Sequence, residues 1–414
     1  MLQQQTRHRL FLITLAFVAF VSLGLPDGLL GVAWPSVRRD FSVPLSQLGS
    51  LLLASMCGYL TSSFFSGVAI MRMGVGWLLV ASSACMVVAL GGYALAPAWP
   101  VMVALAVLNG AGGGAIDGGI NVFAASKFSP RVMNWMHGFY GVGATLGPVL
   151  MTAVLARGAS WRWGYAIVAS VIAVMGVCFL VTLRWWDDPD GGTAAKPQAA
   201  EGAIVEHTTW STLRQPMVWM QISLFFVYTG IEFATGQWAY TLLTESRGMS
   251  MSTAGAAVST FFATFTVGRF AFGAVANHFP SATLLRAATG AIPVAVLSVW
   301  ANLYPAVNVA ALALLGLSLA PVFPMLMSET PKRLGEQTAR RAIGFQVSAA
   351  SLGGAGLPAL IGIVARRAGL EVIAPMLLVN ATLLLVFHEI ALWNDRRACA
   401  KPQAAAEAAL NPEP

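Results

Sequence analysis

Residues 10–34 read LFLITLAFVAFVSLGLPDGLLGVAW, and this stretch decides the fold class of the protein. Residues 10–25 contain no charged side chain, and the whole stretch is longer than the about 20 residues that a helix needs to cross a bilayer. A cleaved signal peptide would end in small residues, whereas polar sequence with Pro26, Asp27 and Gly28 follows here. The stretch therefore predicts a membrane-spanning helix that is retained in the protein.

The composition of the whole chain agrees with this first helix. Of 414 residues, 57% are hydrophobic and only 10% are charged, whereas an ordinary soluble domain carries about 25% charge. A soluble fold of this composition would expose large apolar patches. This excludes a soluble globular enzyme, a disordered protein and a fibrous one. The four cysteines form no CxxC pair, so neither a disulfide framework nor a metal site is indicated.

Further apolar runs follow along the chain, bounded by charged residues, proline or glycine. We predict an all-α membrane protein of twelve transmembrane helices, over residues 9–36, 45–69, 75–95, 99–126, 134–157, 161–184, 216–243, 252–276, 281–302, 305–328, 341–366 and 370–393. They group into an N-terminal six-helix bundle (1–184) and a C-terminal six-helix bundle (216–395). Between them we predict a cytoplasmic linker (185–215), and after them a disordered cytoplasmic tail (396–414).

The distribution of Lys and Arg predicts the orientation in the membrane. Most of the 24 basic residues fall in segments on the side of the N-terminus, among them Lys332 and Arg333. The positive-inside rule then places both termini in the cytoplasm. The net charge of +7 reflects anchoring against an anionic leaflet and not a nucleic-acid partner. We expect a monomer in the inner or plasma membrane.

The two halves resemble each other at an offset of about 204–210 residues. Asp27 matches Glu232, Trp34 matches Trp238, and Gly110 matches residue 316, which is also glycine. Repeats related by an axis along the membrane normal are found in secondary transporters. Such a fold binds its solute near the bilayer midplane and works by rocking one bundle against the other. We therefore predict a transporter working by alternating access, and not an enzyme.

Three carboxylates lie inside predicted spans: Asp27, Asp117 and Glu232. Each is expensive in lipid, so each is expected to face the bundle interior or a wet cavity. At about 1.5 Å per residue, Asp27 and Glu232 lie in the outer half of the membrane and Asp117 nearer the inner half. These three residues are our candidates for proton coupling. The alternative role for Asp117 is static pairing with a neighbouring polar group, and for Asp27 and Glu232 it is a solvated span end near the interface.

Polar and aromatic side chains near these carboxylates are candidates for binding the solute. We predict substrate contacts from the following residues: Asn121, Asn134, His137, Tyr140, Gln237, Trp238 and Gln346. Amides can bond sugar hydroxyls or only bridge helices, and aromatic rings can stack on a sugar or only pack. His137 follows a cytoplasmic loop, so a capping role is the alternative. Arg269, within span eight, is interpreted as a structural gate residue.

Several motifs resemble those of the major facilitator superfamily, over about residues 9–395. They are PDGLLGVAWP (26–35), GGGAIDGGINVF (112–123), NWMH (134–137), YTGIE (228–232) with GQW (236–238), and APVFP (320–324). Within that superfamily the chain is similar to the fucose/galactose/glucose–proton symporter family. The resemblance implies acids essential for transport at Asp27 and Asp117. It also implies a monosaccharide or similar polyol as the solute.

The chain also departs from these motifs. The superfamily's loop between spans two and three normally carries an Asp, and here Met71 stands at that position. Residues 143–148 (GATLGP) partly resemble the antiporter motif GxxxGP, which keeps drug–proton antiport open as an alternative. A membrane sensor with a transporter fold is a third hypothesis. No GK[ST] phosphate-binding loop is present, so we expect no ATP drive and no cofactor beyond the coupling ion, H⁺ or alternatively Na⁺.

Overall fold

The computed structural model describes residues 2–128, 130–186, 212–275 and 279–410, and all regular structure in these ranges is helical. The N-terminal half consists of α1 (Leu2–Asp40), α2 (Gln47–Leu95), α3 (Trp99–Lys127), α4 (Pro130–Ala156), α5 (Trp161–Val181) and the short α6 (Leu183–Trp186). Most of the predicted linker lies outside the described residues.

The C-terminal half begins at Pro216. It consists of α8 (Pro216–Thr241), the π-helical turn η1 (Leu242–Ser246), α9 (Met251–Val275), α10 (Ser281–Ala301), α11 (Pro305–Leu319), α12 (Val322–Leu334), α13 (Glu336–Ala368), the turn η2 (Leu370–Val372) and α14 (Ile373–Leu410). The last helix continues into the segment 396–414, for which the sequence predicts a disordered tail.

Ten helices are long and apolar enough to cross a membrane, within the ranges that the structure describes. One of them, α2, has 49 residues and is interrupted at Gly74, whose φ of 80° is not helical. At about 1.5 Å per residue it is more than twice the thickness of a bilayer core, so it accounts for two predicted spans. The helix α9 has 25 residues, which is also sufficient length. The fold class predicted from the sequence, twelve spans in two bundles, is confirmed.

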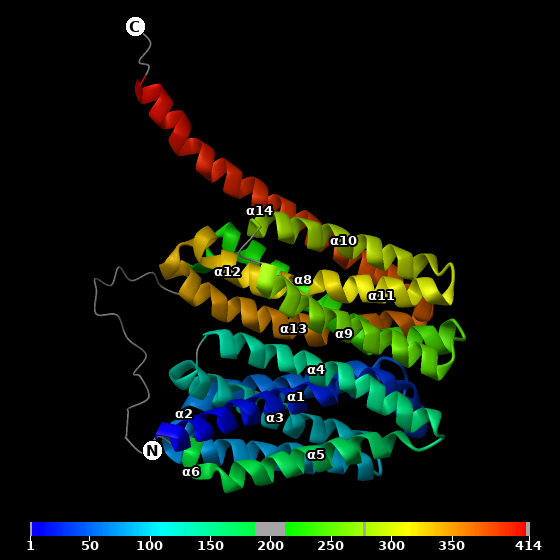
Figure 1. Ribbon diagram of the computed structural model, residues 1–414. Coiled ribbons are helices and arrows are strands. Elements are labelled where there is room, and N and C mark those ends of the chain that lie inside the picture. Colours follow the sequence, from blue (N-terminus) through cyan, green and yellow to red (C-terminus); the bar gives the residue numbers. More distant parts are fainter. Residues whose placement is uncertain (1, 129, 187–211, 276–278, 411–414) are drawn as a thin grey trace.

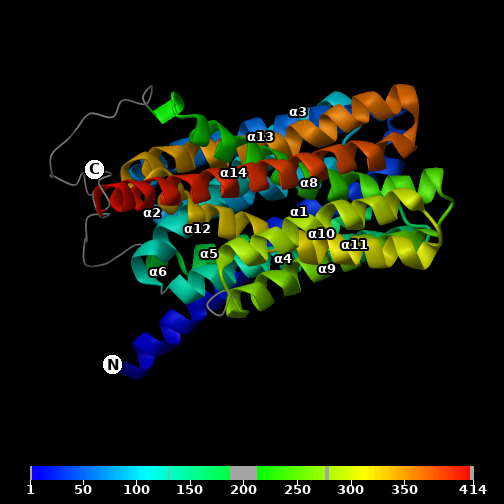
Figure 2. The same cartoon turned by 90° about the horizontal axis from the view of Figure 1, so that it is seen from above.

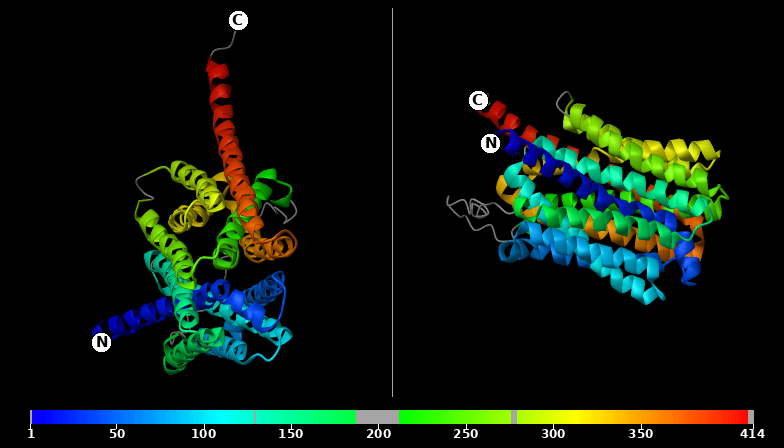
Figure 3. Two further views of the ribbon diagram at one scale, coloured as in Figure 1. Left: turned by 90° about the vertical axis from the view of Figure 1, so that its right-hand side faces the viewer. Right: turned by 60° about the horizontal axis from the view of Figure 1, so that its bottom comes forward.

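The two halves lie side by side, and the axes of their long helices are roughly aligned, with successive helices running in alternate directions (Figures 1 and 2). An end-on view separates the two bundles clearly (Figure 3, left). We call the side where α1 and α8 begin the basic side, because Lys332 and Arg333 lie there at the end of α12. The side where α1 and α8 end is the opposite side. These two names do not specify which side of the protein faces the cytoplasm.

The internal repeat is visible in matching helix contacts. A Cβ added to Gly110 of α3 would lie 1.8 Å from the backbone oxygen of Ser55, and one added to Gly316 of α11 would lie 2.1 Å from that of Phe261. Gly316 and Phe261 each lie 206 residues after their counterparts in the first half, Gly110 and Ser55. Only glycine permits such close approach of two helix backbones. The two halves are therefore built on one packing scheme.

The halves contact each other through three pairs of helices, α1 with α8, α2 with α13, and α4 with α9. Gly31 of α1 lies against the backbone of Gly236 in α8, and Gly49 of α2 lies against Ala359 in α13. At the opposite side, Arg38 and Glu245 form an ion pair between the halves. The pair α4 and α9 also packs across the halves, as Figure 1 shows. This third pair also packs closely toward the basic side, where a Cβ added to Gly138 would lie 2.3 Å from the ring of Phe270.

Candidate functional site

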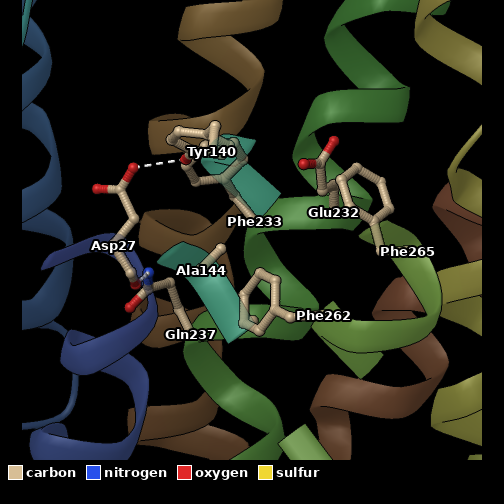
Figure 4. Close-up of a pocket in the computed structure, with 9 residues that line it drawn as sticks. Asp27, Tyr140, Ala144, Glu232, Phe233, Gln237, Phe262 and Phe265 are labelled. Carbon is tan, nitrogen blue, oxygen red and sulfur yellow. Dashed lines mark hydrogen bonds between the residues drawn. The ribbon is translucent and has the colours of Figure 1, made fainter. Parts of the chain in front are cut away.

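A small cavity lies between the two halves (Figure 4). Its lining residues come from α1, α4, α8 and α9 and are Asp27, Tyr140, Ala144, Glu232, Phe233, Gly236, Gln237, Phe262 and Phe265. The centre of a water molecule has about 20 Å³ in which to move there. About 10–15 Å³ is enough for one water. A monosaccharide therefore fits only after the halves move apart.

The N-terminal half contributes Asp27 and Tyr140. Asp27 follows Pro26 inside α1, where proline removes one backbone hydrogen bond without ending the helix. The hydroxyl of Tyr140 on α4 donates to Oδ2 of Asp27 at 2.6 Å (Figure 4). A phenol–carboxylate bond of this length is charge-assisted and strong. It holds the Asp27 side chain at the wall of the cavity.

The C-terminal half contributes Glu232 and Gln237 from α8. The Glu232 side chain is 7% exposed and lies across the cavity from Asp27, beside the ring of Phe265 (Figure 4). Gln237 donates its side-chain N–H to the backbone oxygen of Asp27 at 3.3 Å, which is a bond between the halves. Its Oε1 is buried and has no hydrogen-bond partner among the residues that the structure describes. The cavity thus offers an unused acceptor as well as two carboxylates.

The sequence interpretation did not predict that the charge of Arg269, on α9, acts on a carboxylate of this cavity. Its guanidinium stacks over the Phe265 ring at 4.3 Å, and its charge acts on Glu232 and Tyr228. Its Nε is buried without a hydrogen-bond partner. We interpreted it as a gate residue, but it lies next to a carboxylate of the site. The sequence signal was the single basic residue inside a span, since such residues usually pair with an acid.

Asp117 belongs to a second polar cluster, which lies entirely within the N-terminal half. Tyr59 of α2 donates to its Oδ2 at 2.6 Å, and Asn121, one turn further along α3, donates to its Oδ1 at 2.9 Å. None of the hydrogen bonds found in the described part of the chain joins Asp117 to Asp27. His137 of α4 packs edge-on against the ring of Phe20 on α1, with centroids 5.0 Å apart, and the charges of both Asp117 and Arg269 act on it.

The remaining sequence candidates lie apart from the cavity. Trp238 is fully buried and donates its indole N–H to the backbone oxygen of Pro358 at 2.9 Å. Gln346 is also fully buried, on α13, where it bonds the hydroxyl of Thr330. Asn134 lies on α4, and its side chain is outside what the structure describes. Of the seven predicted substrate contacts, the cavity brings together Tyr140 and Gln237.

The chain matches a known protein family over most of its length. Residues 14–391 match the model of the Major Facilitator Superfamily. The chain belongs to this superfamily. As a member it is a multi-pass membrane transporter and not an enzyme.

Two curated relatives show how far the similarity extends. Bypass of stop codon protein 6 of Saccharomyces cerevisiae is 22% identical over 388 residues, covering 86% of this chain and 77% of that protein. The sodium-dependent glucose transporter 1A of Mus musculus is 25% identical over 388 residues, covering 84% of this chain and 88% of that protein. Both matches extend over most of both chains.

Two solved structures share the fold of this superfamily member. The nucleoside transporter NupG superposes with a TM-score of 0.72 at 12% identity, over 91% of this chain and 98% of that one. FucP in its outward conformation superposes with a TM-score of 0.61 at 16% identity, over 93% and 99%. At these identities the likeness concerns the fold alone.

Proposed function

We propose that this major facilitator transporter carries a monosaccharide or similar neutral polyol together with a proton. The observation that carries the proposal is the cavity itself. It places one carboxylate from each half, Asp27 and Glu232, on its two walls, with an amide between the halves. Groups that belong to different rigid bodies change their surroundings whenever those bodies move. A solute or proton held there is therefore coupled to the rocking motion.

The lining chemistry favours a polyol. Sugar hydroxyls are donors that need acceptors, and the carboxylate of Asp27 and the unused Oε1 of Gln237 supply them. Phe233, Phe262 and Phe265 supply aromatic faces for the apolar face of a pyranose ring. Two similar proteins support the same solute class, since the mouse relative is named a sodium-dependent glucose transporter and FucP a fucose:proton symporter.

The coupling ion in this proposal is a proton bound at Asp27 or Glu232. Each co-transported charge gains about 2.3 kcal/mol per 100 mV of membrane potential. Since 1.4 kcal/mol is a factor of about ten, this drives solute accumulation of several tens-fold. We propose Asp117, in the N-terminal cluster, as a further protonatable group on the path that the proton takes to the basic side. Sodium is the alternative ion, because carboxylate and amide oxygens also bind it.

The proposed orientation places the basic side in the cytoplasm of the cell, with the protein in the inner or plasma membrane. The halves touch at the opposite side through Gly31 and Gly49. With this orientation the protein is closed toward the outside, and the solute is released toward the cytoplasm. In this orientation, a proton gradient directed into the cell would drive import of the solute.

Drug–proton antiport is the second candidate, and the aromatic part of the cavity wall is compatible with it. Three of the nine lining residues are phenylalanines, which also suit an amphipathic compound. This candidate predicts that overexpression raises resistance to a toxic compound. It also predicts acidification of the compartment from which the drug is removed, because the exchanged proton enters that compartment, and this pH change occurs only when drug is supplied.

The test is uptake into proteoliposomes that contain a pH-sensitive dye. D-glucose, D-mannose and L-fucose are added outside, and the proposal expects labelled sugar to enter together with internal acidification. Asp27→Asn and Glu232→Gln should abolish the acidification. Asp40→Asn is the matched control, since Asp40 pairs with Arg162 at the protein surface. Absence of both uptake and pH change with all three sugars would overturn the sugar assignment.

A further inference from the structure

His388 is a buried histidine of α14 that the transport cavity does not use. Its side chain is fully buried, on the same inward stripe of the helix as Ala381, Leu384 and Ala391. Neither Nδ1 nor Nε2 has a hydrogen-bond partner among the residues that the structure describes. A neutral imidazole has one donor and one acceptor to satisfy, so burial without partners is costly. An ionisable residue of this kind inside a membrane-spanning helix is a candidate functional group.

A second fully buried polar side chain lies on α8. Neither Oε1 nor Nε2 of Gln221 has a partner in the described part of the chain. One turn further along α8, the ring of Phe225 packs 5.1 Å from that of Phe323 on α12, and the ring of Tyr228 lies 6.0 Å from it. These three rings lie between Gln221 and the transport cavity. The polar group is therefore separated from the cavity by an aromatic layer.

His388 and Gln221 lie at a similar depth. Gln221 is about four residues from the level of Phe323 toward the basic side. Arg333 is ten residues from Phe323 in the same direction, and its Nε bonds Asp395 of α14 at 3.0 Å. His388 is seven residues back from Asp395, so it is about three residues from the level of Phe323. At about 1.5 Å per residue the two depths differ by about 2 Å. Helices α8 and α14 also pack against each other, so the two residues form one polar layer.

The charged groups around this polar layer form three ion pairs. They are Arg286–Glu389 between α10 and α14, Arg333–Asp395 between α12 and α14, and Lys332–Glu329 within α12. The charges of Arg333, Glu389, Arg286 and Glu329 act on His388. Helices α8 and α13 add no charge at this depth, because residues 216–231 and 342–365 contain no charged residue. Three positive and three negative charges cancel, so the surroundings are balanced only while His388 is neutral.

Arg333 is the group that a charge on His388 disturbs most. Its side chain is only 3% exposed, and its Nη1 is buried without a partner among the described residues. Two positive charges in such a poorly solvated place repel each other. The basic side is also the nearer exit from the polar layer, because Asp395 lies two turns from His388 and is 34% exposed. In the other direction the aromatic layer closes the way.

We propose that His388 is a regulatory proton-binding site, reached from the basic side and separate from the transport cavity. A proton from water on the basic side binds the lone pair of the neutral ring. The imidazolium then repels Arg333 and loosens the tie between α12 and α14 that Arg333 makes with Asp395. Acid on the basic side thereby acts on the C-terminal half whether or not a solute is bound.

Thermal unfolding in detergent, without solute, tests the proton site. It is followed at pH about 7.5 and about 5, on either side of the ordinary imidazole pKa of about 6.5. The wild type should lose stability on acidification, because the unfolded chain takes up this proton freely and buried His388 takes it up only against Arg333. In His388→Gln, whose amide cannot be charged, the loss should be smaller by about 2–4 °C. Equal losses in the two proteins would overturn the proposal.

Removing the neighbouring charge gives an independent variant. In Arg333→Gln a proton on His388 meets the unpaired carboxylate of Asp395 and no longer meets a positive charge. The loss of stability on acidification should then be no larger than in His388→Gln. Lys332→Gln is the matched control, since it removes the same charge at the next position, where the side chain is 66% exposed. It should keep the response of the wild type, and equal responses of the Arg333 and Lys332 variants would contradict the proposal.

Spin labels test the movement of α12. Lys332→Cys and Val386→Cys place labels at exposed positions of α12 and α14, in a variant whose native cysteines are replaced by serine. In proteoliposomes the distance should lengthen only when acid is added on the side from which an impermeant thiol reagent reaches position 332. His388→Gln should abolish the change.

A control pair of labels on α10 and α14 lies further from the polar layer, at the exposed positions Val294→Cys and Val379→Cys. Its distance should stay constant. An unchanged distance between positions 332 and 386 in acid would show that α12 stays tied and would overturn the proposal, as would a change caused by acid on either side. No solute is used, so the outcome is independent of the proposed sugar.

Discussion

Asp27 and Asp117 are two carboxylates inside membrane-spanning helices. Each has a tyrosine hydroxyl as its nearest partner, but the side chains around the two pairs differ. Each accepts a tyrosine hydroxyl at 2.6 Å, from Tyr140 and Tyr59 respectively. Beyond that bond, Asp27 faces Gln237 and Glu232 of the other half. Asp117 instead accepts a second bond from Asn121 of its own helix.

The two carboxylates differ in which of their contacts would change when the halves move apart in the proposed transport cycle. The partners of Asp117 move with it as one body, so their hydrogen bonds survive a rocking motion. The partners of Asp27 across the cavity move away from it. A group whose surroundings differ between two states is the one that can bias the equilibrium between those states. We therefore assign coupling to Asp27 and Glu232 within the proposed function, and proton passage to Asp117.

The largest effect is expected from removing the Asp27 carboxylate. Asp27→Asn should reduce sugar accumulation from several tens-fold to equilibration, because a driving force of about 2.3 kcal/mol per 100 mV is lost. Asp117→Asn should slow uptake and leave accumulation measurable. Labelled-sugar uptake under an imposed potential measures both. Equal loss of accumulation in the two variants would break the comparison.

A smaller effect is expected from the charge beside Glu232. Arg269→Gln leaves a nearly buried carboxylate without its countercharge. The charge of Arg269 acts on Glu232, so we expect its loss to cost about 1–3 kcal/mol of folding stability, the range for leaving a buried polar group uncompensated. Thermal unfolding in detergent measures it. The double variant with Glu232→Gln should recover most of the loss, and failure to recover would place the stabilising contact elsewhere.

The two tyrosines separate the clusters further. Tyr140→Phe removes a hydrogen bond to a carboxylate, which contributes about 1.5–3 kcal/mol. At the cavity this should slow sugar uptake about tenfold or more. Tyr59→Phe removes a bond of the same length, but Asn121 still holds Asp117. Its uptake rate should fall less. The reverse order of the two rates would contradict the assignment.

The smallest effect is expected at the Arg38–Glu245 ion pair. Both side chains are partly exposed, at 26% and 20%. Exposed pairs contribute about 0–1 kcal/mol, so Arg38→Glu should shift the balance between the two states only slightly toward opening at that side. The rate of labelled-sugar uptake reports the shift and should change by at most about fivefold. The charge swap Arg38→Glu with Glu245→Arg should return the rate to its original value.

Sequence reasoning was strongest where hydrophobicity dominates. The helices follow the apolar runs closely, since a chain in lipid must satisfy its backbone hydrogen bonds internally. The pairing of Asp27 with Glu232 across the halves followed from the repeat and from their similar depth. Periodicity alone did not show which face of α8 lines the cavity. Gln237 lies there, but the next residue, Trp238, turns away to Pro358.

Composition and hydrophobic period were enough to predict the lipid surroundings, the helices, the repeat of the two halves and the few charges that remain in the membrane. Composition and period are properties of the chain, and lipid enforces them at every residue. Only the tertiary structure decided which polar groups meet. It joined Asp27 to Tyr140, placed Arg269 beside Glu232, and left Asp117 within one half. Such contacts depend on how helices far apart in the chain rotate and pack against each other, and that rotation is settled by side-chain fit across the two bundles.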